Sequence, residues 1–228
     1  MNRIRKISDS IITNRKYIRF ILHSIFFNFY YLPIKQAIKL PIMLYKPKLL
    51  RMKGIVVIRG EVKTGMIKLG GYAVSFYPNS GIVWENHGGI CEFNGSCTIG
   101  NSSTISIGIN GKLEFGDKFC ATAALKVACY HSISFANEVL IGWDNIIMDT
   151  DLHQIMNDEN VVINQPKPII IDEKVWIGAR CFILKGVRVS RGNIIAANTL
   201  LTKTTECSNA ILGGLPLEVI RDKVRWLK

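Results

Sequence analysis

Aliphatic residues recur at every sixth position over the stretch from 171 to 201. These positions hold Ile171, Ile177, Ile183, Val189, Ile195 and Leu201. A period of six fits neither the 3.6-residue turn of an α-helix nor the simple alternation of a long strand. It fits a solenoid whose short parallel strands each turn one corner per repeat, with small residues at the corners. The pattern therefore predicts an all-β solenoid of stacked coils.

The period of six extends upstream with interruptions. Ile141 and Ile147 share the phase of the later hexads, and Ile99 with Ile105 repeats the spacing. Between residues 60 and 134 the phase slips, which indicates loops or bulges inserted between coils. Residues 154–168 contain no hexad, are largely polar and end in proline, so we expect a loop that leaves the solenoid there.

The N-terminal part of the chain has a different composition. Residues 1–60 contain thirteen Lys and Arg against one acidic residue, Asp9, which equals the net charge of the whole chain, +12. Apolar residues spaced three, four or seven apart predict an amphipathic helix with cations on its other faces. The apolar stripe is Ile4, Ile7, Ile11, Ile18, Leu22, Ile25 and Phe29, and the cations are Arg3, Arg5, Lys6, Arg15, Lys16 and Arg19.

Two interpretations of this helix stay open. Its densest apolar run, residues 20–32, is too short to span a bilayer. A basic amphipathic segment can bind an anionic membrane surface, or it can cap the exposed strands at the end of a solenoid. We accordingly expect three segments: a basic amphipathic segment and linker over 1–53, a β-helix over 54–214 with its first strand at 55–58, and a short helical tail over 215–228.

Charge, cysteine and histidine content narrow the class of protein. Beyond residue 60 the acidic and basic residues balance, so no nucleic-acid partner is expected. No close Cys-x-x-Cys pair and no export signal are present, which predicts reduced thiols in a cytoplasmic protein. No histidine has ligand spacing to another histidine or a cysteine, so no metal site is expected. The cysteines are Cys91, Cys97, Cys120, Cys129, Cys181 and Cys207.

Several motifs carry a family resemblance. They are IDEKVWIG at 171–178, ILKGV at 183–187, NTLLTK at 198–203, GGLPLEVIR at 213–221 and IGWDNIIMDTDLH at 141–153. The first four resemble the hexapeptide-repeat acyltransferases, and the last is similar to the branch associated with O-acetylation of polysaccharide and lipopolysaccharide. The resemblance implies a left-handed parallel β-helix, acetyl-CoA as the acyl donor and a homotrimer.

His153 is the candidate catalytic base. It is the last residue before the predicted loop, where the family places its catalytic histidine, and imidazole suits proton transfer near neutral pH. Asp149 and Asp151 alternate with it and would project to one side of a short strand, where either could orient the imidazole, hold a sugar hydroxyl or serve as a corner carboxylate. His131 is a rival base without an adjoining loop, and a turn histidine that bonds backbone is the structural alternative.

The resemblance also implies positions for the two substrates. For the pantetheine arm of acetyl-CoA the matching residues are Gly178, Ala179, Ala196 and Ala197, and for its phosphates they are Thr202, Lys203 and Arg221. Leu215 and Glu218 depart from the family pattern, and Glu218 would repel a phosphate. Trp143 and Asn145 lie one hexad before His153, either near the acceptor or in corner packing.

Two classes of function follow. The first is an O-acetyltransferase acting on a saccharide in cell-surface polysaccharide biosynthesis, with serine-type small-molecule acetylation as its alternative. The second is a noncatalytic solenoid scaffold at a membrane. His153 with its loop and the hexads over 178–203 favour the enzyme, because a scaffold needs neither. We expect it in the cytoplasm, and the basic segment leaves open the inner face of the cytoplasmic membrane.

Overall fold

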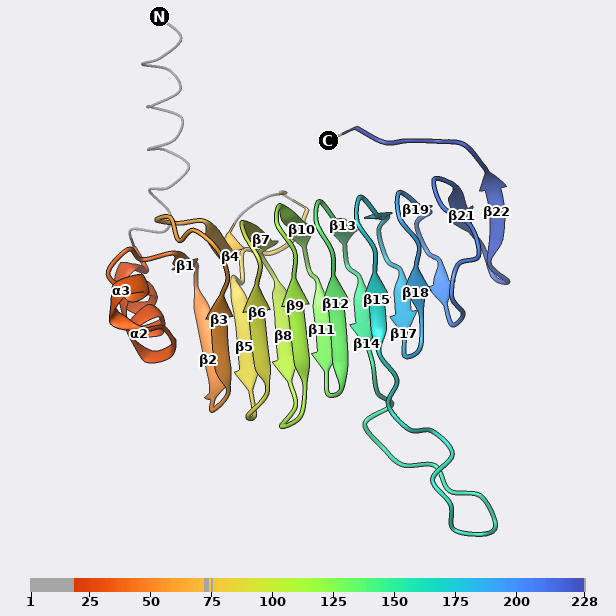
Figure 1. Ribbon diagram of the computed structural model, residues 1–228, viewed down its shortest axis with the longest axis horizontal. Coiled ribbons are helices and arrows are strands. Elements are labelled where there is room, and N and C mark those ends of the chain that lie inside the picture. Colours follow the sequence, from red (N-terminus) through yellow and green to blue (C-terminus); the bar gives the residue numbers. More distant parts are fainter. Residues whose placement is uncertain (1–18, 72–73, 75, 228) are drawn as a thin grey trace, which may run out of the picture.

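The computed structural model describes residues 19–71, 74 and 76–227, which wind into a solenoid whose coils form three long sheets (Figure 1). Sheet A contains β1 (Ile42–Leu44), β4 (Ile67–Gly71), β7 (Cys97–Gly100), β10 (Phe119–Ala123), β13 (Leu140–Trp143), β16 (Trp176–Ile177), β19 (Ile194–Ile195), β21 (Ile211–Gly213) and β22 (Glu218–Arg221). Sheet B contains β2 (Pro47–Met52), β5 (Ile82–Asn86), β8 (Ser103–Ile107), β11 (Lys126–Cys129), β14 (Ile146–Met148), β17 (Phe182–Leu184) and β20 (Leu200–Leu201). Sheet C contains β3 (Ile55–Ile58), β6 (Ile90–Phe93), β9 (Lys112–Phe115), β12 (Ser132–Phe135), β15 (Ile169–Ile171) and β18 (Arg188–Val189).

The predicted period of six corresponds to the inward-facing columns of the solenoid. In sheet A, Ile141 pairs with Ile177 and Ile177 with Ile195, each one coil further along. In sheet C, Ile171 pairs in the same way with Val189. All of these side chains are fully buried. The predicted β-helix is confirmed, because each hexad places one aliphatic side chain on the axis and the coils stack in register.

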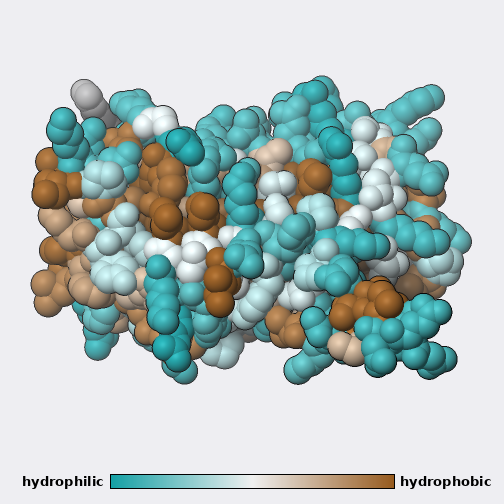
Figure 2. Space-filling model, turned by 60° about the horizontal axis from the view of Figure 1, so that its bottom comes forward, coloured by the Kyte–Doolittle hydropathy of each residue, from teal (hydrophilic) through white to brown (hydrophobic). Residues whose placement is uncertain are grey.

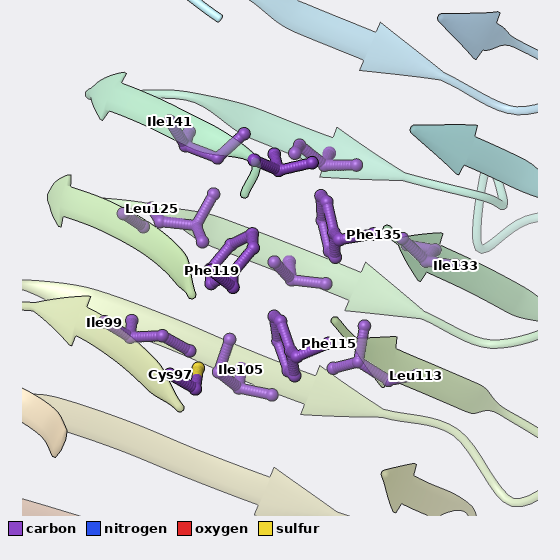
Figure 3. Packing of buried hydrophobic residues seen from close by; sticks show 14 of the residues in the cluster. Cys97, Ile99, Ile105, Leu113, Phe115, Phe119, Leu125, Ile133, Phe135 and Ile141 are labelled. Atoms are coloured by element: carbon purple, nitrogen blue, oxygen red, sulfur yellow. The ribbon is translucent and has the colours of Figure 1, made fainter. Parts of the chain in front are cut away.

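Aromatic residues fill the interior where the period of six is irregular. The ring of Phe115 stacks between those of Phe93 and Phe135, with centroids 5.4 Å apart on both sides. Figure 3 shows Phe115 and Phe135 side by side in the interior, with Phe119 beside them. These large side chains keep the upstream coils filled without a regular aliphatic repeat.

The N-terminal end of the solenoid is capped by a helix. Helix α2 (Ile21–Tyr31) packs under β1 and is followed by the short helix α3 (Ile34–Ala37). Buried Asn28 donates to the carbonyl of Ile42 (2.7 Å) and accepts from its N–H (3.1 Å), while the Leu44 N–H donates to Ser24 Oγ at 2.9 Å. The first strand therefore has backbone groups satisfied by side chains of α2, so the helix caps this end of the solenoid. It does so with a face other than the predicted stripe, whose described members Leu22, Ile25 and Phe29 are exposed. The stripe residues Ile4, Ile7, Ile11 and Ile18, and the cations before Arg19, lie outside the described residues.

Two predicted boundaries are wrong. The solenoid begins at β1 and β2, within the segment expected to be a linker, because Pro47 takes the first position of a strand, where a missing N–H is tolerated. At the other end, the expected helical tail over 215–228 is absent from its described part. Residues Glu218–Arg221 instead form β22, which pairs antiparallel with β21, because a turn through Gly214 returns the chain to the edge of sheet A.

Candidate functional site

His153 lies at the base of a loop that leaves the solenoid between β14 and β15 (Figure 1). The loop is a narrow hairpin, closed by an antiparallel bridge between Met156 and Val162, which confirms the predicted departure from the repeat. The His153 N–H donates to the Asp151 carbonyl at 2.7 Å, and the His153 carbonyl accepts from Asn164 Nδ2 at 2.8 Å. The residue is exposed, and its imidazole has no hydrogen-bond partner in the described part of the chain. The backbone is held while the ring is available to a ligand.

A polar cluster, which we call the latch, fixes the base of this loop. It consists of Asp151, Asn164 and Lys185. The Asp151 carboxylate accepts from the Lys185 ammonium and from Asn164 Nδ2, and Lys185 also donates to the Asn164 carbonyl at 2.8 Å. The hydrogen bond from Lys185, reinforced by that from Asn164, lowers the pKa of Asp151 below its ordinary value. Asp151 therefore positions the loop that carries His153, and its carboxylate makes no hydrogen bond to the imidazole among the described residues.

Asp149 lies elsewhere than expected. It is fully buried, and its two carboxylate oxygens accept from the backbone N–H groups of Tyr130 and His131, both at 2.8 Å. The expected alternation with His153 fails because β14 ends at Met148 and Leu152 has a φ of 63°, so the backbone is not extended between the two residues. Asp149 ties one coil to the preceding one and does not orient the imidazole.

Trp143 and Asn145 occupy the corner between sheets A and B. Asn145 is fully buried, with Oδ1 accepting from the Cys181 N–H (2.8 Å) and Nδ2 donating to the Gly178 carbonyl (2.9 Å). Of the two alternatives for Asn145, these contacts correspond to corner packing, because the side chain joins two coils. Trp143 is partly exposed, and its ring centroid lies 5.8 Å from that of Phe76. Sequence analysis missed Phe76, whose only signal was an aromatic residue in an irregular, hexad-free stretch.

The predicted donor residues fall into two groups. Gly178, Ala179, Ala196 and Ala197 stack at the corner between sheets A and B, where the Asn198 N–H donates to the Ala179 carbonyl at 2.9 Å. A Cβ on Gly178 would lie 2.8 Å from the backbone of the next coil, so close stacking requires the glycine. Exposed Thr202 and Lys203 follow β20, at the opposite edge of sheet B, and exposed Arg221 ends β22. Within one chain, the residues predicted to bind the pantetheine arm therefore lie together. The residues predicted to bind the phosphates lie apart from them.

The hollows on the surface are distributed unevenly. A small cavity of about 170 Å³ is lined by His153, Thr150, Gln154 and other loop residues. This volume is smaller than that of most ligand pockets. A larger hollow of about 580 Å³ lies on the outer face of sheet C, and its lining does not include this histidine. Its arginines are already paired, Arg188 with Asp172 and Arg191 with Glu173, both at 3.0 Å. Because its charges satisfy each other, we assign the chemistry to the His153 loop despite its smaller cavity.

The described residues contain neither a metal-binding cluster nor a helix that could span a membrane. Within residues 19–71, 74 and 76–227, no group of three His, Cys, Asp or Glu side chains is arranged to hold a metal ion. Over the same ranges, no helix has both the length and the apolar character needed to cross a bilayer.

Comparison with known proteins identifies similar acetyltransferases. No family model matches the chain. Over 110 residues it is 31% identical to the galactoside O-acetyltransferase of Lactococcus lactis subsp. lactis (strain IL1403), a match that covers 48% of this chain and 52% of that enzyme. Over 62 residues it is 42% identical to the 2,3,4,5-tetrahydropyridine-2,6-dicarboxylate N-acetyltransferase of Staphylococcus aureus (strain JH9), covering 26% of each. The chain therefore spans about half the length of the galactoside O-acetyltransferase and about a quarter of the length of the N-acetyltransferase.

Solved structures establish the fold. The crystal structure of the polySia-specific acetyltransferase NeuO superposes with a TM-score of 0.55 at 19% identity, covering 80% of this chain and 72% of that chain. The chain thus has the left-handed parallel β-helix fold. The resemblance to hexapeptide-repeat acetyltransferases that the repeat predicts is confirmed in fold and, over part of the chain, in sequence.

Proposed function

We propose that this protein is an acetyl-CoA-dependent O-acetyltransferase that acts on a saccharide in cell-surface polysaccharide biosynthesis. The observation that carries the proposal is His153, an exposed imidazole whose backbone is fixed by the latch of Asp151, Asn164 and Lys185. General-base catalysis needs an imidazole within hydrogen-bond reach of the acceptor proton, and this ring is free to accept one. The similarity to a galactoside O-acetyltransferase and to NeuO supports acetyl transfer to a sugar.

In the proposed reaction His153 accepts the proton of an acceptor hydroxyl. The hydroxyl oxygen then forms a bond to the thioester carbonyl carbon, and the carbon–sulfur bond breaks as the tetrahedral intermediate collapses. The imidazolium returns its proton to the leaving thiolate, so the histidine ends neutral and ready for the next cycle.

The arrangement of the site supports a homotrimer. His153 follows β14 at one edge of sheet B, whereas Ala179 and Ala197 lie at the other edge, so one chain cannot present base and donor groove together. The outer face of sheet B also carries a run of apolar residues, suited to contact with neighbouring chains. They are Ile146, Met148, Phe182, Leu184 and Leu200. A cyclic assembly would bring the His153 loop of one chain to the donor corner of the next.

Two aromatic side chains lie near the donor corner. Trp143 lies beside the donor corner, and its ring and that of Phe76 are both exposed to solvent. Sugar rings pack well on such faces, which supports a saccharide acceptor. An anionic membrane surface is the further proposed partner, since residues 1–60 carry the whole excess of positive charge.

A second candidate is acetylation of a small molecule, including a serine-type acceptor. It is favoured by the 42% identity to the staphylococcal N-acetyltransferase, whose substrate is a small dicarboxylate. The match covers only 62 residues, 26% of this chain, so we rank this candidate below the saccharide.

The test measures release of coenzyme A thiol from acetyl-CoA with panels of oligosaccharides and small amines. His153→Ala should lower turnover by about two to four orders of magnitude without loss of folding. His131→Ala is the matched control, because His131 is an exposed histidine of the preceding coil, where its backbone N–H and not its ring binds Asp149. A His153→Ala variant that keeps most of its rate would remove the histidine from the mechanism. No transfer to any acceptor by the native protein would favour the scaffold.

A further inference from the structure

Helix α2 has two different faces. The face with Ser24, Phe27 and Asn28 is buried against the first coil, which accounts for the capping. The opposite face is apolar and open: Leu22, Phe26 and Phe29 expose 76%, 52% and 50% of their surface. Capping therefore uses only half of the helix.

The open face continues into the chain that follows. Ile34, the first residue of α3, and Ile38, just after it, are also largely exposed. We call the five residues Leu22, Phe26, Phe29, Ile34 and Ile38 the end patch. Figure 2 shows apolar side chains gathered at the end of the molecule that carries α2 and α3 in Figure 1. A contiguous apolar patch of this kind marks a surface that binds something.

The charge around the end patch is mainly positive, and the nearby carboxylate of Glu61 is already paired with Lys63 at 3.0 Å. Arg19, Lys35 and Lys39 are exposed beside it, and the sequence from residue 10 to residue 60 contains no acidic residue. A protein partner would have to supply every balancing carboxylate. Anionic lipid headgroups supply them as a continuous layer, with apolar chains directly beneath for the aromatic and aliphatic side chains.

We propose that the end patch docks the protein on an anionic bilayer, with the axis of the solenoid standing away from the lipid. This deepens the proposed function and rests on it for the identity of the acceptor. Since α2 lies across the end of the solenoid and the patch faces outward from that end, contact with lipid fixes which end of the molecule is near the membrane. Three chains packed side by side would present three such patches to one plane.

The docking sets the height of the catalytic loop. From β2 to β14, which precedes His153, sheet B advances by four strand spacings, or roughly 19 Å. The thickness of α2 adds about 10 Å, so the histidine stands roughly 30 Å above the lipid. The acceptor is then a sugar several residues away from its lipid anchor, and the sugar next to the anchor lies out of reach.

The first experiment measures binding to vesicles made of equal parts phosphatidylglycerol and phosphatidylcholine, with the full chain. Phe26→Ser combined with Phe29→Ser should weaken cosedimentation at least tenfold, because two exposed rings lose their apolar contact. Ile109→Ser is the matched control, because Ile109 is an even more exposed apolar residue (72%) outside the end patch, between β8 and β9, and this variant should bind like the native protein. Native-like binding by the double variant would overturn the end patch as the docking surface. Equal binding to vesicles of pure phosphatidylcholine would overturn the proposed attraction between the cations of the protein and anionic lipid headgroups.

The second experiment tests the orientation. Phe26→Trp should be strongly quenched by brominated lipid, whereas Leu227→Trp, exposed near the other end of the chain, should not be. Quenching of both, or of Leu227→Trp alone, would overturn the proposed orientation.

The third measurement separates docking from catalysis. Vesicle-bound enzyme should acetylate long lipid-linked oligosaccharides and spare short ones, while the same oligosaccharides free in solution should show no such length dependence. The Phe26→Ser, Phe29→Ser variant should retain native activity on the free acceptors. If the native protein acetylates none of the free acceptors, the proposed function is refuted and the proposed docking is not. Transfer to short and long lipid-linked acceptors alike would refute the proposed height.

Discussion

The latch offers a test of whether Asp151 acts by positioning or by touching the reacting groups. Lys185→Met keeps the length of the side chain and removes the ammonium that binds the Asp151 carboxylate. The two side chains are 19% and 44% exposed, so their pair should contribute only about 0.2–1 kcal/mol to the free energy of unfolding. Displacement of His153 by about 1 Å can nonetheless lower the rate by roughly a hundredfold. We therefore expect a large loss of turnover with almost no change in melting temperature.

A double-mutant cycle with Asp151→Asn decides the mechanism of this loss. If Asp151 acts through Lys185, the double variant should be no slower than either single variant, because the same contact is removed. Lys126→Met is the matched control, since it breaks an exposed ion pair of 2.9 Å with Asp144 away from the loop, and should leave turnover unchanged. Rate losses that add across the cycle would refute the positioning role.

The same pair predicts a dependence on pH. Its folded-state pKa is lowered, so the stabilising contribution of Asp151 is present above the ordinary carboxyl pKa near 3.9 and is lost as pH falls through the lowered value. The difference in unfolding free energy between native protein and Lys185→Met should be constant at neutral pH and shrink only below about pH 4. Denaturant titrations at several pH values measure it, and a difference that disappears near pH 6 would contradict the assignment.

The remaining predictions concern the interior. Phe115→Ala should lower the free energy of unfolding by about 3–5 kcal/mol, because the ring stacks between two others at 5.4 Å; denaturant unfolding checks this, and a loss below about 1 kcal/mol would contradict it. Asn145→Ala should lower it by about 1–3 kcal/mol, since a buried amide and carbonyl of the next coil lose their partner; native-like stability would count against that role. Cys91 and Cys129 should resist alkylation in the folded protein, because burial raises the pKa of both thiols, and mass spectrometry would detect rapid modification if this is wrong.

The repeat made the interior and the loop predictable. A hexad is a local pattern, and each aliphatic residue at its period, such as Ile177, faces the axis because the next coil repeats the same turn one strand spacing away. The break in the period after His153 indicated where the chain leaves the solenoid, and the hairpin there is confirmed. These features depend on residues close in sequence, so composition and spacing were enough.

The corners and the ends were decided by tertiary structure alone. Asp149 and Asn145 are polar residues beside the predicted site, yet both are buried and bind backbone groups of neighbouring coils, 19 and 36 residues away in the sequence. The return of β22 to the edge of sheet A and the two faces of α2 likewise depend on where the solenoid ends. Local spacing determined which side chains enter the core of this protein, because every coil repeats the one before. The partners of its buried polar groups are distant in sequence and lie in neighbouring coils, so only the stacked structure brings them together.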